Sequence, residues 1–532
     1  MAIARWNPPV ARTRQENVLL KRLDRVRKLL GFLRLHRHEL FDDAFQDELA
    51  LMYRTTGAGK GALPPALLAM ATLVQGYLAM SYAEMVELTV VDLRVQMVLG
   101  CLGAEAPPFS QGALQEFRER LIGAEMDRRL LERTVALAKQ TQAFDYRKLP
   151  KTLRVAIDSS PLEGAGRVED TYNLLAHAAR NVAQCAARLL GWRLEKVCTE
   201  AGSPLLVGPS VKAALDIDWN DAGEKAAALT TLVRQLDALQ TWIERRLPEA
   251  LTTPPLQAHL ETLTQICTQD VEPDPEGSGV RVRQGVAADR RVSVEDTEMR
   301  HGRKSKSKRF NGFKRHIATD VDGGLILACA ITPANRPEEE AIPSLRTDLA
   351  RQALTIDQLL IDRGYINSLL VDEVLTRRGR IVCKPWKSHN GRLFPKSAFS
   401  LNLRDRTITC PQGHVQPLAF GTIVEFDPEI CDPCPRRTQC TSAERGHGRT
   451  VAIAENEALQ HRLRQQIQTS AGRAALRERT TIEHKLAHIS QRQGNHARYV
   501  GVRKNTFDLR RASAIQNLET LHRSEIEPRK AA

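Results

Sequence analysis

Aromatic residues make up only 5% of the 532-residue chain, so broad aromatic stacking surfaces are not expected. The sequence has no run of about 18 or more apolar residues, which argues against a membrane-spanning helix. Its first residues, Met1 to Arg14, mix Arg, Trp and Pro without an apolar stretch and are not typical of a signal peptide. From these absences we expect a cytoplasmic protein with no membrane partner.

Positive charge, in contrast, is in excess. The chain carries 77 Lys and Arg against 63 Asp and Glu, a formal net charge of +14. This balance favours a polyanionic partner, although a basic protein that binds nothing in particular would show the same balance. The length is too great for a single hydrophobic core, so several domains are expected.

Hydrophobic periodicity divides the first half of the chain. Apolar residues at helical spacing predict an all-α region over residues 1–150. The apolar run Leu153–Ile157 predicts a first strand within residues 151–162. Residues 163–285 turn helical again and are expected to form an all-α insert that ends in a loop at 272–277. Residues 200–279 contain thirteen Asp and Glu but only five Lys and Arg. This acidic insert is therefore a poor candidate for lying along phosphates.

Strand patterns return over residues 286–384. Two strands joined by a hairpin turn are followed in alternation by a helix, a strand, a helix and a strand: 313–319, 325–331, 338–352, 358–361, 367–378 and 380–384. With the strand before Asp158, this order predicts a mixed α/β sheet of the ribonuclease-H type. A Cys-rich insert is expected over residues 385–455, and a helical, basic C-terminal region over 456–532.

Three acidic residues stand out within these elements. Asp158 and Asp362 each follow an apolar strand, and Glu483 lies on a predicted helix with Arg479 one turn earlier. Carboxylates on rigid elements suit two divalent ions about 3.5–4 Å apart, which can cut a phosphodiester bond. Turn or cap roles for the two Asp residues, and a solvated ion pair for Glu483, are the alternatives. A predicted buried stripe beside Glu483 argues against the solvated pair: Ile482, Leu486 and Ile489.

At these residues the sequence resembles bacterial insertion-sequence transposases of the DDE type, and more closely the group with an N-terminal helical domain and a Cys-containing insert. Four stretches carry the resemblance in a specific order: Ala156–Pro161; Asp296–His316; Thr332–Asn335 with Ile361–Tyr365; and Glu478–Leu509. Related families also carry a Tyr three residues before the Arg and a Lys seven residues after the Glu. Here those two positions hold Leu476 and Ser490.

The resemblance implies that Asp158, Asp362 and Glu483 bind two Mg²⁺ or Mn²⁺ ions and carry out catalysis. It implies double-stranded DNA as partner, both terminal inverted repeats and target DNA, in the bacterial nucleoid. Because two element ends are cut in concert, a homodimer is expected. Two other functions stay open: a transposase-derived DNA-binding protein that does not cut, and a nuclease of the same fold that does not transfer strands.

The cysteines of the Cys-rich insert have the spacing of a metal site. Cys410 is followed by the C-x-x-C pair Cys431 and Cys434, and then by Cys440. Four thiolates in a reducing compartment suit one structural Zn²⁺ in a zinc-ribbon-like fold, with His414 as a substitute ligand. Loop thiols without metal are the alternative.

Basic residues with nearby polar side chains are candidate DNA contacts. Residues 300–315 contain eight Lys and Arg, which suits a phosphate-binding loop but also a solvated basic loop. A second basic stretch follows Glu483 and includes Arg498, Arg510 and Arg511. Trp386 either stacks on an unpaired base or is buried. The N-terminal helices are expected to bind the element ends. The predicted contacts are Arg300, Arg303, Lys304, Lys306, Lys308, Arg309, Lys314, Arg315, Trp386, Arg479, Arg503 and Lys504.

Overall fold

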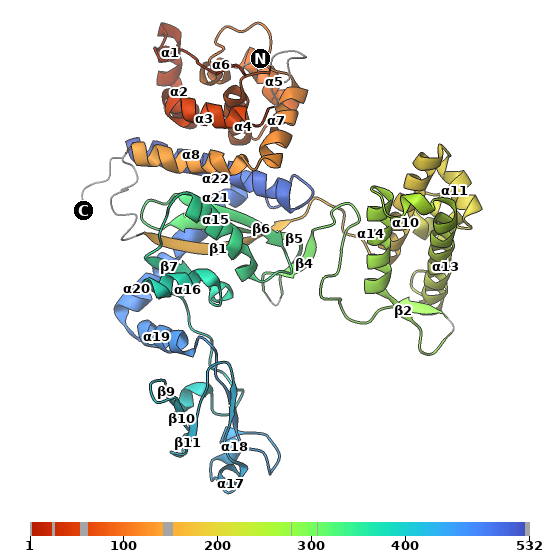
Figure 1. Cartoon of the computed structure of the whole chain (residues 1–532), viewed down its shortest axis with the longest axis vertical. Helices are drawn as coiled ribbons and strands as arrows, with labels where there is room; N and C mark the ends of the chain where they lie inside the picture. Colours follow the sequence, from red (N-terminus) through yellow and green to blue (C-terminus); the bar gives the residue numbers. More distant parts are fainter. Residues whose placement is uncertain are drawn as a thin grey trace.

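The computed structural model describes residues 3–23, 27–53, 62–141, 153–277, 279–305 and 307–526. Figure 1 shows a central sheet core with an N-terminal helical region on one side of it. A helical lobe extends sideways from the core, and a small strand-rich lobe lies at the opposite end from the N-terminal region. We refer to these lobes as the helical insert, residues 163–285, and the Cys-rich insert, residues 385–455.

Helices make up the described part of the N-terminal region, as predicted. Their starts are set locally: Ser81, Asp92 and Ser110 each accept a backbone N–H of the helix that follows. The helices are α1 (Arg14–Leu23), α2 (Lys28–Leu40), α3 (Asp43–Ala50), α4 (Pro65–Leu78), α5 (Tyr82–Val91), α6 (Leu93–Leu99), α7 (Gln111–Gly123) and α8 (Asp127–Gln140).

The sheet core is mixed, which confirms the predicted mixed α/β class. Its strands are β1 (Arg154–Glu163), β4 (Arg300–Arg303), β5 (Arg309–Asp320), β6 (Ile326–Pro333), β7 (Gln358–Ile361) and β8 (Arg380–Val382). The order is β4-β5-β1-β7-β8, and β6 also pairs with β5. β5 is antiparallel to β1 and β6, whereas β1, β7 and β8 are parallel.

The prediction that the first strand ends at Asp158 is wrong, because β1 continues to Glu163. The apolar run stops at Ile157, and so does the parallel pairing with β7. The antiparallel pairing with β5 continues to Glu163↔Gly312 and keeps the polar residues after Asp158 extended. Asp158 therefore lies inside a strand, at the point where β1 loses one of its two neighbours.

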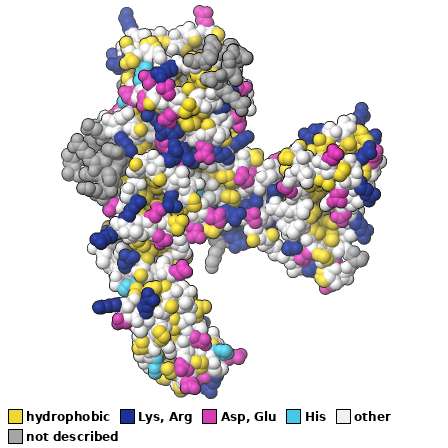
Figure 2. All heavy atoms as spheres, in the orientation of Figure 1, with side chains coloured by type: hydrophobic (Ala, Val, Ile, Leu, Met, Phe, Trp, Pro, Cys, Tyr) yellow, Lys and Arg dark blue, Asp and Glu magenta, His cyan; other side chains and the backbone are white. Residues whose placement is uncertain are grey.

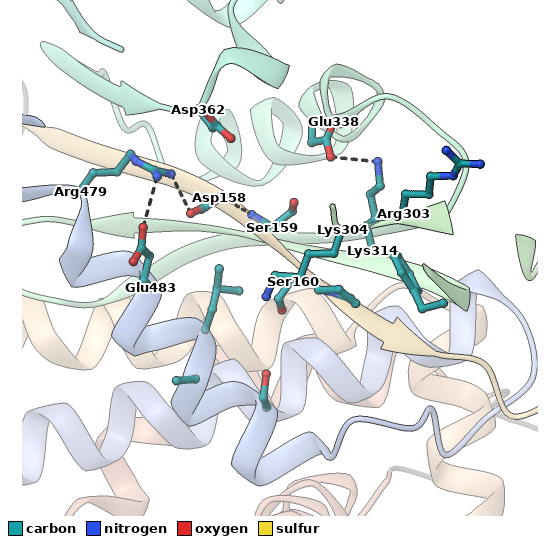
Figure 3. Close-up of a pocket in the computed structure, with 15 residues that line it drawn as sticks. Asp158, Ser159, Ser160, Arg303, Lys304, Lys314, Glu338, Asp362, Arg479 and Glu483 are labelled. Atoms are coloured by element: carbon teal, nitrogen blue, oxygen red, sulfur yellow. Dashed lines mark hydrogen bonds and ion pairs between the residues drawn. The ribbon is translucent and has the colours of Figure 1, made fainter. Parts of the chain in front are cut away.

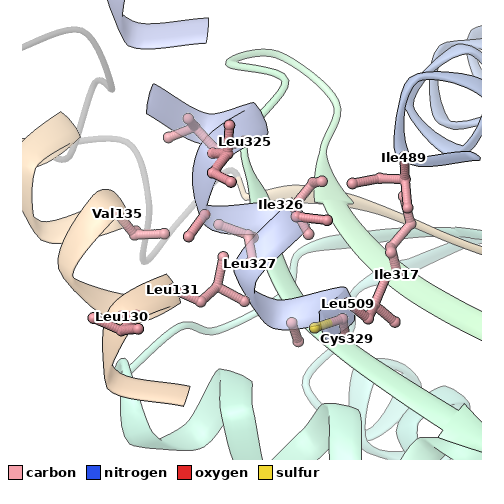
Figure 4. Close-up of a cluster of buried hydrophobic side chains, with 14 of the residues drawn as sticks. Leu130, Leu131, Val135, Ile317, Leu325, Ile326, Leu327, Cys329, Ile489 and Leu509 are labelled. Atoms are coloured by element: carbon pink, nitrogen blue, oxygen red, sulfur yellow. The ribbon is translucent and has the colours of Figure 1, made fainter. Parts of the chain in front are cut away.

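Helices from both ends of the chain pack on this sheet. The long α22 (Val502–Ile526) contacts both α8 and β6, so the N-terminal region and the sheet share one hydrophobic core. Figure 4 shows this junction, where Leu131 and Val135 of α8 approach Leu327 of β6. The remaining helices of the core are η4 (Glu338–Ala341), α15 (Ile342–Arg351), η5 (Arg363–Tyr365), α16 (Leu369–Thr376), α19 (Glu457–Gln468), α20 (Ser470–Glu478) and α21 (Thr480–Gln493).

The helical insert has a hydrophobic core of its own. Its helices are α10 (Thr171–Leu190), α11 (Leu194–Glu200), η2 (Pro204–Leu206), α12 (Val211–Leu215), α13 (Ala222–Arg246), η3 (Pro248–Ala250) and α14 (Leu256–Asp270). The insert is not purely helical: β2 (Val271–Pro273) pairs with β3 (Val280–Val282) where a loop was predicted. Apolar Val271 and Val280 pack against the insert core, which explains why the segment extends as a hairpin.

The Cys-rich insert is built from short strands around a third, small core that includes Phe399, Ile408 and Phe426. Two small sheets, β11-β10-β9 and β12-β13, surround it. Its elements are η6 (Lys396–Ala398), β9 (Ser400–Asn402), β10 (Thr407–Thr409), β11 (Val415–Pro417), β12 (Ile423–Glu425), α17 (Pro428–Cys431), α18 (Arg437–Cys440) and β13 (Thr450–Ala452).

Within the described residues, no single helix is long and apolar enough to cross a membrane. The pair α4 and α5, bent by 103°, passes such a test of length and composition only when its two helices are taken together.

Candidate active site

The sheet register brings Asp158 and Asp362 together. The last parallel pair of β1 and β7 is Ile157↔Ile361, and each aspartate is the residue that directly follows this pair along the chain. Since parallel strands in register run side by side, their carboxylates lie at the same edge of the β1–β7 pair. Each carboxylate is oriented by a backbone N–H of the following residue: Ser159 N lies 2.8 Å from Asp158 Oδ1, and Arg363 N lies 2.7 Å from Asp362 Oδ1.

Glu483 reaches the same place from α21. Ile482, Leu486 and Ile489 are buried, and α21 contacts β1, so the helix is fixed against the sheet. Asp158, Asp362 and Glu483 all line one cavity of about 540 Å³. Figure 3 shows the three carboxylates on one side of it, with Arg303, Lys304 and Lys314 further along. The structure thus brings together three acidic residues that lie far apart in the sequence.

Arg479 bridges two of these carboxylates. Its Nη1 donates to Asp158 Oδ2 at 2.8 Å, and its Nη2 donates to Glu483 Oε1 at 3.2 Å (Figure 3). Burial raises the pKa of Asp158 above its ordinary value, and the charges of Asp362 and Glu483 also raise it, while Arg479 and the Ser159 N–H lower it. At the triad, three carboxylates therefore lie near one guanidinium that only partly offsets their charge.

These carboxylates fit hard divalent cations in donor type and charge. Carboxylate oxygens are the ligands that Mg²⁺ and Mn²⁺ prefer. Among the described residues, no three His, Cys, Asp or Glu side chains lie close enough together to hold one metal ion. At the acidic triad, the position between Asp158 and Glu483 is taken by the Arg479 guanidinium, so the countercharge is at present supplied by the protein itself.

Sequence reasoning assigned no role to a buried network behind the carboxylates. His316 on β5 is fully buried, with Nδ1 2.7 Å from the Tyr365 hydroxyl and Nε2 2.9 Å from Thr332 Oγ1. Burial raises the pKa of the Tyr365 hydroxyl well above its ordinary value, and the Asp158 charge adds to this. Tyr365 stands three residues after Asp362, a spacing that could have singled it out. His316 could be identified only from the strand pairing.

A fourth carboxylate, Glu338, also lines the cavity and escaped sequence reasoning. It accepts a hydrogen bond from Lys314 Nζ at 2.9 Å. Glu338 belongs to a run of three glutamates, which is typical of an exposed helix start, so the sequence carried no signal for it. Lys314, predicted as a DNA contact, is thus at the cavity but already paired.

The exposed predicted cations cluster on the hairpin that joins β4 to β5. Arg303, Lys304, Lys308 and Arg309 are exposed, and the first two line the cavity. This group is named the basic hairpin; Lys306, within it, lies outside the described residues. In Figure 2, Lys and Arg side chains gather beside the neck that leads to the helical insert. Lys504 on α22 is also exposed.

Other predicted DNA contacts are buried and bonded within the protein. Arg300 bonds Asp289, and Arg315 is only 1% exposed with every N–H used. In the second basic stretch, Arg510 pairs with Asp127 and Asp348, and Arg511 with Asp508, all buried; the partly exposed Arg503 also bonds Asp127. As the structure stands, these arginines hold elements together and do not face a ligand.

Trp386 is 44% exposed, so the alternative of a buried indole is wrong. Its backbone N–H donates to Gln460 Oε1 of α19, which holds the start of the Cys-rich insert against this helix. The ring is therefore open to stacking.

The four clustered cysteines line one small cavity of about 30 Å³ together with His414. Burial raises the pKa of the Cys440 thiol, and Cys431, Cys434 and Cys410 lie close enough to raise it further. Soft thiolates around a small cavity fit Zn²⁺ in donor type. Here too, among the described residues, no three of the thiols lie close enough together to hold one metal ion.

Residues 281–518 match the family model of the transposase DDE domain. The C-terminal part of the chain therefore carries a domain of this family, which implies phosphoryl transfer on DNA with divalent metal ions. The matched range contains Asp362 and Glu483 but begins after β1, so Asp158 joins the site only through the sheet. No curated protein and no solved structure matches the chain.

Proposed function

We propose that this protein is a DNA transposase of insertion-sequence type with a ribonuclease-H-like core. It cleaves element ends and transfers the resulting 3′-hydroxyls to target DNA, using two Mg²⁺ or Mn²⁺ ions on Asp158, Asp362 and Glu483. The observation that carries the proposal is the register Ile157↔Ile361, which sets two aspartates side by side in a cavity that also receives Glu483.

The chemistry has two displacements at phosphorus. In the first, water attacks the phosphodiester at the element end and the 3′-oxygen leaves as a hydroxyl. In the second, that 3′-hydroxyl attacks a target phosphodiester and a target 3′-oxygen leaves. Divalent ions held by Asp158, Asp362 and Glu483 would activate the attacking oxygen and stabilise the leaving one. Asp158 and Asp362 are each oriented through Oδ1 by a backbone N–H, and the second oxygen of Asp158 accepts from Arg479.

The basic hairpin supports DNA at the edge of the cavity. Arg303 and Lys304 line the same cavity as the carboxylates, so a phosphate beside the reacting one would meet a cation there. We propose Lys306, Lys308, Arg309 and Lys504 as further phosphate contacts and Trp386 as a stacking platform. The buried Arg300 and Arg315 are left out of this set.

The rest of the assembly follows from the same proposal. The N-terminal helical region binds the terminal inverted repeats, and two copies of the chain act together on double-stranded DNA in the bacterial cytoplasm. In the Cys-rich insert, Cys410, Cys431, Cys434 and Cys440 hold a structural Zn²⁺. Their shared small cavity supports this part of the proposal.

Substitution of the carboxylates tests the mechanism. Asp158→Asn, Asp362→Asn and Glu483→Gln should each lower cleavage of terminal-inverted-repeat DNA in Mg²⁺ by about a thousandfold or more, because each removes a metal-ligand charge. Asp372→Asn is the matched control, since Asp372 is an exposed carboxylate of α16 outside the cavity.

Three outcomes separate the candidate functions. Cleavage followed by joined products supports a transposase. Cleavage without joining would indicate a nuclease, and binding without cleavage a DNA-binding protein. If all three carboxylate variants cut as well as the wild type, the mechanism proposed here is wrong.

A further inference from the structure

The guanidinium of Arg315 is almost completely enclosed by protein. Its relative exposure is 1%, and its Nε and both Nη atoms bond five oxygen acceptors at 2.8–3.1 Å. An Arg side chain has five N–H donors, so all of them are satisfied. Nothing of this side chain is left to bind a phosphate.

The five acceptors come from two elements that each carry a proposed metal ligand. On β1, Nε bonds Ser160 Oγ at 2.9 Å and Nη2 bonds the Pro161 carbonyl at 2.9 Å. At the end of α21, the acceptors are Ser490 Oγ, Gln493 Oε1 and the Gly494 carbonyl. Arg315 thus joins the strand of Asp158 to the helix of Glu483.

The bonded residues lie close to the ligands. Ser160 is two residues after Asp158 and directly opposite Arg315 in the β1–β5 register. Ser490 is two turns of α21 after Glu483, and both serines line the catalytic cavity. A shift of α21 along β1 would therefore break these bonds and move Glu483 relative to Asp158.

All five acceptors of Arg315 are neutral oxygens of hydroxyl, amide or carbonyl groups. None of the five is a carboxylate, so no ion pair at these bonds offsets the cost of burying the charge. What distinguishes arginine is its planar fork, which can reach five acceptors in fixed directions where lysine reaches three. The side chain is therefore suited to fixing the relative positions of its acceptors rather than to forming an ion pair.

A second link between α21 and β1 involves a proposed metal ligand directly. Arg479, at the start of α21, is bonded to Asp158 itself, a proposed metal ligand. Arg315 holds the other end of the helix through groups that are not ligands. Its bonds can persist whatever occupies the carboxylates.

We propose that Arg315 is a positioning residue that sets the distance between Glu483 and Asp158 by fixing the end of α21 against β1. This inference rests on the proposed two-metal function. It also replaces the expectation that Arg315 binds DNA.

The test compares variants by Mn²⁺ binding without DNA, followed by electron paramagnetic resonance, and by cleavage kinetics. Arg315→Lys keeps the charge but loses acceptors, and the pair Ser490→Ala with Gln493→Ala removes the two side-chain acceptors on α21. Loss of such supporting bonds should weaken Mn²⁺ affinity by about 10- to 100-fold. The kcat for cleavage should fall while KM for DNA stays unchanged, because the side chain is buried.

Arg492→Gln is the matched control. Arg492 is also on α21, but it bonds Glu519 of α22 at 2.7 Å, on the side of the helix that faces α22. This variant should lose stability, measured as Tm, without loss of Mn²⁺ affinity. Equal Mn²⁺ loss in Arg492→Gln, or a raised KM with a reduced salt dependence in Arg315→Lys, would overturn the proposal.

Failure of the underlying function gives a different result. If wild-type protein binds no Mn²⁺, or binds it equally well after Asp158→Asn and Asp362→Asn, the metal site itself is wrong, and the positioning role falls with it. If those variants abolish binding while Arg315→Lys does not change it, only the positioning role is overturned.

Discussion

His316 is held neutral in the interior, one layer behind the carboxylates. Tyr365 and Thr332 bond its two ring nitrogens, and burial lowers the pKa of His316 to about 3. In the unfolded chain the same ring would take up a proton near its ordinary pKa of 6.5. Acid therefore favours the unfolded state at this residue.

His316→Asn should flatten the acid side of the stability profile. Between about pH 6.5 and 3 the His316 ring is protonated in the unfolded chain but not in the folded chain. The contribution of this residue to the free energy of unfolding is therefore complete above pH 6.5, and it falls by about 1.4 kcal/mol for each unit by which the pH is lowered through this window. The amide oxygen of Asn can still accept from Tyr365 at the position of Nδ1. We expect the Tm of variant and wild type, followed by calorimetry, to converge or cross as pH falls through this window. Parallel Tm curves would contradict the assignment.

The exposure of the individual arginines was only partly predictable from the sequence. Eight of the sixteen residues 300–315 are Lys or Arg, yet Arg303 is exposed and Arg315 is buried. Strand alternation places Arg315 on the face of Phe313 and Ile317, both buried, which is a readable signal. That its partners would come from α21, far along the chain, is a product of tertiary packing.

At the scale of elements, apolar runs predicted β7 and the start of β1 because buried strands need them. The extension of β1 to Glu163 was not predictable, since residues 158–161 are polar or Pro and are kept extended only by β5. The helical C-terminal segment was predicted as one stretch but divides into α19, α20 and α21. The breaks matter, because the last of them sets the start of the helix that carries Glu483.

The Cys-rich insert offers a prediction on metal content. Protein purified without chelators should contain about one zinc ion per chain, bound by four thiolates. Cys431→Ser and Cys434→Ser should lose it and lower the Tm of this lobe, because its small core is completed by Cys410, Cys431 and Cys440. Elemental analysis by mass spectrometry measures the content.

Two controls accompany that measurement. Cys101→Ser changes a partly buried thiol outside the lobe and should keep the zinc. Asp362→Asn should also keep it, which separates this metal from the catalytic ions. Zinc-free wild-type protein would show that the thiols are ordinary loop cysteines.

On the scale of the whole molecule, the described residues contain three separate hydrophobic cores. The largest joins the N-terminal region to the sheet, and a buried ion-pair group of Asp127, Arg510 and Asp348 reinforces the junction. The helical insert, in contrast, leaves and re-enters the sheet core at neighbouring points: Glu169 N donates to the Val292 carbonyl at 3.2 Å.

Excision of the helical insert should therefore leave the catalytic core folded. With residues 171–286 replaced by a Gly/Ser linker of about ten residues, which spans at most about 33 Å, the sheet can still close. Calorimetry should show the loss of one unfolding transition, and Mn²⁺ affinity should match that of the full chain. Loss of all cooperative unfolding would mean that the insert core is not independent.

The position of α22 has a consequence for synthesis on the ribosome. Because α22 covers α8 and β6, these two elements, which are made before it, wait for residues 502–526 before their shared core can close. Glu483 precedes α22 by only a short segment, so the triad is completed shortly before α22 is made. A message cut short before α22 yields a product with uncovered apolar surface, a substrate for proteases.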